Sequence, residues 1–165
     1  MFRIVQRSKT GNTNHMPSLT VSTHFGPLTL QEHDGAIVRL DWHGDGHDQT
    51  LLLDEAAGQL RAYASGTLQV FDLPVRVAGS DFQRDVCAHI SAIPFGEIRT
   101  YGDIALALGK PAQAVGAACG GNPIPVIIPC HRVMGAKGLT GFSGKGGVET
   151  KVALLRHEGA GGFLI

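Results

Sequence analysis

The stretch NPIPVIIPCHRV, residues 122–133, says more about the fold than any other part of the sequence. Its apolar run from Ile124 to Ile128 predicts a buried strand, and Pro129 ends that strand because proline cannot donate to a sheet. Cys130 and His131 follow directly. Adjacent side chains of an extended strand point to opposite faces, so a turn or a bridging water is needed to bring the thiol and the imidazole together.

Cys130 is the candidate nucleophile of this stretch. The thiolate is the reactive form, and we expect the neighbouring His131 and Arg132 to lower the Cys130 pKa from the free value of about 8.5. A base also needs an orienting partner. Glu158, at the end of the last predicted helix, is the best candidate for that role.

The chain has two other cysteines, Cys87 and Cys119. Both lie on apolar faces of predicted helices, where we expect inert core residues. Three cysteines at these spacings fit neither a disulfide framework nor a four-ligand zinc site. The sequence therefore predicts free thiols and no metal.

Residues 80–121 predict short helices with clear end signals. Ser80 begins a capping-box pattern, Thr100 is a second N-cap candidate, and Pro111 suits the first turn of a helix over 111–119. Two short helices joined by about three residues are typical of a helix-turn-helix, a pattern that any helical hairpin shares.

The helix expected over 111–119 has small side chains on much of its surface. Such a helix lets its backbone approach another body closely. Two interpretations remain open, tight packing against the protein's own core or insertion into a nucleic-acid groove. The small residues are Ala112, Ala114, Gly116, Ala117 and Ala118.

Residues 1–79 predict an α/β unit with a small antiparallel sheet. Asp34-Gly35 is a strong two-residue hairpin signal, residues 52–63 have helical spacing, and residues 70–77 read as a further short strand. The pattern changes after Gly79. We therefore expect an N-terminal unit over 1–79 and a C-terminal unit over 80–165.

The composition restricts the class of protein. Of 165 residues, 43% are hydrophobic and 17% are charged, which is typical of a globular chain, and no apolar run is long enough to cross a bilayer. The net charge is zero. Basic residues between Arg99 and Lys151, including Arg132, form either a modest polyanion-binding face or an ordinary solvated surface. No secretory signal opens the chain, so we expect a cytoplasmic protein.

Several blocks of the sequence, in this order and spacing, resemble the O6-alkylguanine-DNA alkyltransferases, also called methylated-DNA protein-cysteine methyltransferases. They cover about half of the chain, and the Pro-Cys-His-Arg-Val block is very specific. The blocks are Phe82-Gln83, 93–96, 100–102, 114–116, Asn122-Pro123, 129–133, 138–144, 151–155 and 157–159.

The resemblance implies an α+β fold, with an N-terminal α/β unit and a helical C-terminal domain that carries a helix-turn-helix and a wing. It implies binding of double-stranded DNA in the minor groove, extrusion of the damaged base, and irreversible transfer of an alkyl group from guanine O6 to the cysteine. One turnover per molecule, no cofactor and a monomeric state are expected.

The resemblance also implies the roles of the catalytic residues. Cys130 is the alkyl acceptor, His131 activates it through water, and Glu158 orients His131. Asn122 ties together the turn of the motif. Tyr101 presses on the phosphate beside the target and hydrogen-bonds the extruded base.

Pocket and DNA contacts are implied in the same way. The carbonyls of Cys130 and Val133 accept from the exocyclic amine of the base, and the backbone N–H of Ser143 donates to O6. Phe142 and Gly144 complete the pocket. The residues expected to contact DNA are Thr100, Gln113, Ala114, Gly116, Ala117 and Arg132.

Three positions depart from the family pattern. Gln113 stands where the family has an arginine that enters the base stack, so we expect weaker DNA binding or extrusion. Phe142 stands where many members have tyrosine, and Cys87 where bacterial members often have tryptophan.

Two further functions remain possible at this point. One is an alkylated-DNA recognition protein with weak or no transfer, which Gln113 makes conceivable. The other is a cysteine hydrolase built on Cys130, His131 and Glu158, which lacks an accompanying oxyanion-hole signature.

Overall fold

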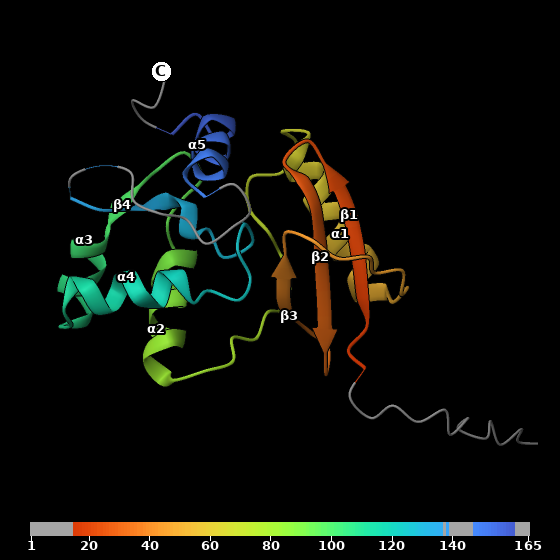
Figure 1. Ribbon diagram of the computed structural model, residues 1–165, viewed down its shortest axis with the longest axis horizontal. Helices are drawn as coiled ribbons and strands as arrows, with labels where there is room; N and C mark the ends of the chain where they lie inside the picture. The colour runs from red at the N-terminus through yellow and green to blue at the C-terminus, as the bar shows by residue number, and fades with distance from the viewer. Residues whose placement is uncertain (1–14, 137, 139–146, 161–165) are drawn as a thin grey trace, which may run out of the picture.

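The structure is a computed structural model that describes residues 15–136, 138 and 147–160. Its first part is a three-stranded antiparallel sheet of β1 (Ser18–Thr23), β2 (Gly26–His33) and β3 (Ala36–Asp41), in that order. Helix α1 (Leu51–Ala64) lies along one face of this sheet (Figure 1). The expected α/β arrangement of the first half is present.

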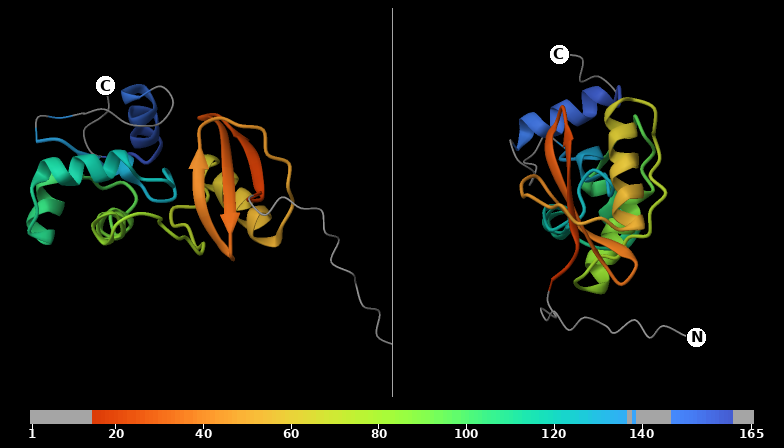
Figure 2. Two further views of the ribbon diagram at one scale, coloured as in Figure 1. Left: turned by 60° about the horizontal axis from the view of Figure 1, so that its bottom comes forward. Right: turned by 90° about the vertical axis from the view of Figure 1, so that its right-hand side faces the viewer.

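The second part is mainly helical. Figure 2 shows its helices on one side of the molecule and the sheet with α1 on the other. Two short strands pair in parallel within it, β4 (Arg99–Thr100) and β5 (Val133–Met134). The helices are α2 (Asp81–Ser91), α3 (Tyr101–Leu108), α4 (Ala112–Gly120), the 3-10 helix η1 (Cys130–Arg132) and α5 (Val148–His157).

Local signals explain where several elements begin. Asp34 and Gly35 both have positive φ, 47° and 76°, as a two-residue hairpin turn between β2 and β3 requires. Thr100 caps α3, and the Asp103 side chain accepts from the Thr100 N–H to complete the capping box. Ser80 caps α2 through the Gln83 N–H.

The Gln83 side chain does not complete a capping box at α2. Its amide donates instead to the Ala118 carbonyl of α4 at 2.8 Å. The sequence pattern therefore gives the correct start of α2, while the side chain of Gln83 connects two helices.

Two predicted strands are wrong. Residues 70–77 contribute only an isolated bridge between Val75 and Ile37, because Pro74 lacks a donor. Ile124 to Ile128 form a tight turn, with the Ile128 N–H bonded to the Ile124 carbonyl at 2.9 Å and Val126 at φ 71°. This apolar run is buried as expected, but its conformation is not extended.

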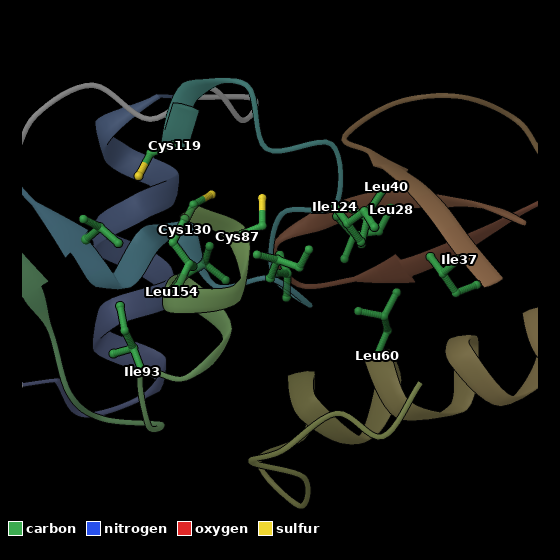
Figure 3. Close-up of a cluster of buried hydrophobic side chains, with 14 of the residues drawn as sticks. Leu28, Ile37, Leu40, Leu60, Cys87, Ile93, Cys119, Ile124, Cys130 and Leu154 are labelled. Atoms are coloured by element: carbon green, nitrogen blue, oxygen red, sulfur yellow. The ribbon is translucent and has the colours of Figure 1, made fainter. Parts of the chain in front are cut away.

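One hydrophobic cluster runs through both parts of the molecule. Figure 3 shows it extending from Leu28, Leu40 and Leu60 at the sheet and α1 to Cys130 and Leu154 among the helices. The Leu40 N–H of β3 also donates to the Pro123 carbonyl at 3.0 Å. Among the described residues, no helix is long and apolar enough to span a bilayer.

We expect Thr50→Ala to lower the free energy of unfolding by about 1 kcal/mol, because the Thr50 side chain accepts from the Leu53 N–H at the start of α1. Urea titration followed by circular dichroism measures this change. Thr50→Ser keeps the acceptor oxygen and should remain close to the parent protein. Equal losses in both variants would contradict a capping role.

Candidate active site

The 3-10 helix η1 places Cys130 and His131, which the sequence analysis had placed at the end of a strand. It forms because Pro129 follows the tight turn and its carbonyl accepts from the Arg132 N–H at 2.9 Å. With about three residues per turn, successive side chains diverge by less than in a strand. The two side chains are therefore not directed to opposite faces, as they would be in a strand.

Asn122 holds the turn that precedes η1. Its side-chain amide donates to the Ile128 carbonyl at 2.8 Å, and its side-chain oxygen accepts from the Ile124 N–H at 3.0 Å. Both bonds are buried. The described geometry therefore gives Asn122 the contacts expected of a residue that ties this turn together.

Glu158 lies at the C-terminal end of α5 in the protein interior. Gly159, with φ 64°, ends the helix, and the following Ala160 N–H closes back onto the Leu155 carbonyl at 3.0 Å. Glu158 Oε2 lies 2.8 Å from His131 Nε2, which is the expected contact. Arg132 donates to the same carboxylate at 2.7 and 3.0 Å.

A third side chain also donates to this carboxylate, the Tyr63 hydroxyl at 2.6 Å. Burial by itself raises the Glu158 pKa, but the hydrogen bonds from His131, Arg132 and Tyr63 lower it to about 2. Glu158 is therefore ionised at neutral pH.

The ionised carboxylate fixes the tautomer of His131. A carboxylate only accepts, so His131 Nε2 must carry the proton. Burial lowers the His131 pKa, which favours the neutral ring. Nδ1 is then the basic nitrogen, and it is buried without a hydrogen-bond partner among the described residues.

The Cys130 thiol is less acidic than the sequence suggested. Burial raises its pKa to about 11, although a hydrogen bond from Asn122 and the charge of Lys151 act in the opposite direction. The Arg132 guanidinium is paired with the Glu158 carboxylate at 2.7 and 3.0 Å. The expected lowering of the Cys130 pKa is therefore wrong.

Lys151 is a site residue that the sequence analysis did not identify. It is 1% exposed, and its ammonium group donates to the Val133 carbonyl. The available signal was its position on α5, three residues before the buried Leu154 on the same helix face. Its closeness to Cys130 depends on the packing of α5 against η1 and carries no local signal.

The pairing of β4 with β5 brings two further candidates to the site. Thr100 pairs with Met134 and Arg99 with Val133, so Tyr101, the first residue of α3, lies beside the strand that follows η1. The Thr100 hydroxyl is used for helix capping. Val133 is fully buried.

Helix α4 has one face toward the core and another toward solvent. Val115, Ala118 and Cys119 face the core, whereas Gln113 and Ala117 are exposed. A Cβ atom added at Gly116 would meet nothing within 4 Å. Packing against the protein's own core therefore does not account for the small outer face of α4.

Arg132 does not face solvent. Its side chain is 7% exposed, donates to Glu158 and to the Ile93 carbonyl, and lies 5.8 Å from the Phe95 ring centre. The expectation that Arg132 contacts DNA is corrected by this geometry. Because Lys151 is also buried, the basic face inferred from the charge count is smaller than expected.

Three expected pocket residues, Phe142, Ser143 and Gly144, lie outside the described residues. All three cysteines are free and buried. In the part of the chain that the structure describes, no group of three or more His, Cys, Asp or Glu side chains is arranged to hold a metal ion.

The sequence and the structure were compared with those of known proteins. The family model for the DNA-binding domain of 6-O-methylguanine DNA methyltransferase matches residues 81–160. The methylated-DNA–protein-cysteine methyltransferase of Mycobacterium tuberculosis is 41% identical over 150 residues, covering 84% of this chain and 90% of the relative. The Methanosarcina barkeri protein of the same name is 40% identical, covering 84% of this chain and 94% of the relative.

This chain belongs to the methylated-DNA–protein-cysteine methyltransferase family. The crystal structure of the Mycobacterium tuberculosis O6-methylguanine methyltransferase has a TM-score of 0.79 and 39% identity, covering 88% of this chain and 93% of that one. The protein of that organism in complex with DNA has a TM-score of 0.76 and 39% identity, covering 86% and 92%. The resemblance and the α+β fold predicted from the sequence are confirmed.

The low pKa of Glu158 predicts that the free energy of unfolding depends on pH. Its pKa of about 2 in the folded protein lies below the ordinary value of 4.5, so the stabilisation is present above pH 4.5 and is lost as the pH falls toward 2. We expect Glu158→Gln to remove up to about 3 kcal/mol of this pH-dependent change. Urea unfolding at several pH values measures it.

Glu97→Gln is the matched control, because the Glu97 side chain is 51% exposed. It should leave the acid loss of stability close to that of the parent protein. If Glu158→Gln retained the full acid loss, Glu158 would not be the group that takes up the proton.

Proposed function

We propose that this protein repairs DNA by transferring an alkyl group from O6 of guanine to the sulfur of Cys130, once per molecule. The observation that carries the proposal is the buried pairing of His131 with the ionised Glu158 beside Cys130, which leaves His131 Nδ1 as a base. A DNA complex of the Mycobacterium tuberculosis relative supports DNA as the partner.

The proposed reaction balances without a cofactor. The Cys130 proton moves through water to His131 Nδ1, the sulfur attacks the alkyl carbon, and the bond from that carbon to O6 breaks. The leaving guanine takes up a proton, and the products are a thioether and an unmodified base. Because burial holds the thiol protonated at rest, the proton transfer to His131 is an essential step.

The pocket contacts follow the family pattern. We assign Tyr101 to the phosphate beside the target and to proton delivery as the guanine leaves. The carbonyls of Cys130 and Val133 accept from the exocyclic amine, and the Ser143 N–H donates to O6. Phe142 and Gly144 form the pocket wall. The Val133 carbonyl already accepts from Lys151 and has a second lone pair for this purpose.

The DNA-binding role belongs to α3 and α4, which we propose act as a helix-turn-helix. The exposed, small outer face of α4 allows its backbone to approach the minor groove, and the target base leaves the stack because a buried thiol cannot reach O6 inside a duplex. The proposed contacts on duplex DNA are Thr100, Gln113, Ala114, Gly116 and Ala117.

The remaining expectations are part of the proposal. The unit over 80–165 carries DNA binding and transfer, and the unit over 1–79 supports it. The protein acts as a monomer in the cytoplasm.

The first functional prediction is that Cys130→Ala abolishes alkyl transfer, because the acceptor sulfur is gone. Incubation with duplex DNA containing O6-methylguanine, followed by intact-mass measurement, detects the adduct of one methyl group. Cys87→Ser and Cys119→Ser should still form it. Binding without an adduct in the parent protein would favour a recognition protein, and repeated turnover of an ester would favour a hydrolase.

The second functional prediction concerns Gln113, which is exposed near the start of α4. Arginine would offset more of the cost of unstacking through stacking and charge, so Gln113→Arg should raise the second-order rate on alkylated duplex about tenfold. The rate with free O6-benzylguanine should change little. Equal acceleration with both substrates would mean that residue 113 acts on the pocket.

A further inference from the structure

Tyr63 connects the N-terminal part of the molecule to the active site. It lies in α1, is 1% exposed, and donates its hydroxyl hydrogen to Glu158 Oε2 at 2.6 Å across 95 residues of sequence. The other donors to this carboxylate, His131 and Arg132, both come from η1. Oε2 thus accepts from Tyr63, from His131 and, at 3.0 Å, from Arg132.

A second bond fixes the position of Tyr63 relative to the end of α5. His157 Nε2 donates to the Tyr63 carbonyl at 2.7 Å, and the next residue, Glu158, accepts from the Tyr63 hydroxyl. Both ends of one tyrosine are therefore bound to consecutive residues of the segment that carries the carboxylate.

Aromatic rings surround the Tyr63 side chain. Phe71 lies 5.4 Å, Phe95 6.4 Å and His157 5.0 Å from it between ring centres. A ring packed on several sides cannot swing its hydroxyl away from Glu158. The hydroxyl is held in one position by packing that does not depend on the hydrogen bond.

The Tyr63 hydroxyl can act only as a donor to Glu158. Burial raises the Tyr63 pKa, and the nearby Glu158 charge raises it further, so the hydroxyl keeps its proton. Each donor to Oε2 draws negative charge from the oxygen that also faces His131. The other charged groups that act on His131 are Arg132 and Lys151, and both disfavour a protonated ring.

We propose that Tyr63 is a positioning residue for alkyl transfer, which sets through Glu158 the orientation and the proton affinity of His131. This inference rests on the proposed function of Cys130 and His131. The N-terminal part of the chain then contributes directly to the chemistry of the C-terminal part. Without the hydroxyl, Glu158 stabilises a protonated His131 more strongly, and less of the ring is available as a base at a given pH.

The test is the pH dependence of a single turnover with free O6-benzylguanine, which separates reactivity from DNA binding. We expect Tyr63→Phe to lower the limiting rate about tenfold, because His131 is less well oriented. We also expect the acid limb of the profile to move upward by about one pH unit, because the proton affinity of His131 rises. The half-saturating substrate concentration should stay near the parent value. Phe71→Leu is the matched control, since it loosens the same packing and should leave the acid limb in place.

A second measurement avoids reliance on the folding of Tyr63→Phe. The chain has two tyrosines, so 3-fluorotyrosine incorporated into a Tyr101→Phe protein labels Tyr63 alone. The fluorinated hydroxyl is a stronger donor. The acid limb should then move to lower pH relative to unlabelled Tyr101→Phe, opposite to the shift in Tyr63→Phe.

An unchanged rate and acid limb in Tyr63→Phe, or an acid limb that does not respond to fluorination, would overturn the positioning role. Loss of rate without a pH shift, matched by Phe71→Leu, would reduce Tyr63 to a packing residue. The intact mass of the parent protein is read in the same experiment. An adduct on Cys130 keeps the proposed function in place when the Tyr63 proposal fails, whereas its absence would reject both.

Discussion

A buried negative charge is stable only where donors surround it, and Glu158 imposes this requirement on the whole molecule. Its carboxylate is nearly inaccessible and accepts from His131, Arg132 and Tyr63. These donors come from η1 and α1, and the acceptor comes from the end of α5. Displacing α1 or η1 would remove at least one of these donors, so the carboxylate couples the sheet-and-helix part to the helical part.

The same charge organises the chemistry around Cys130. It keeps the proton on His131 Nε2 and leaves Nδ1 as the basic atom, while burial keeps the thiol protonated. The nucleophile therefore forms when a base removes the proton, and it is not a standing thiolate. If each molecule transfers one alkyl group, as proposed above, this arrangement protects it, because a resting thiol reacts slowly with other electrophiles.

Sequence patterns correctly predicted those features that depend on residues close together in the chain. The turn at Asp34 and the caps at Ser80 and Thr100 depend on neighbouring residues, and they were located correctly. The His131 and Glu158 contact was also anticipated, first from the need of a base for an orienting partner and then from the family motif. The run from Ile124 to Ile128 was misjudged because hydrophobicity reports burial, whereas prolines and the Asn122 bonds impose a turn.

Charged side chains were the least predictable part of the site. Arg132 and Lys151 were counted as surface cations, and Tyr63 had no local signal, because their partners lie on other elements. Their true positions change the account of DNA binding. Two cations that would have faced phosphates instead stabilise the interior, and α4 offers Gln113 and small side chains to the solvent. In the proposed complex, close approach of the α4 backbone, rather than a high density of positive charge, supplies much of the contact with DNA.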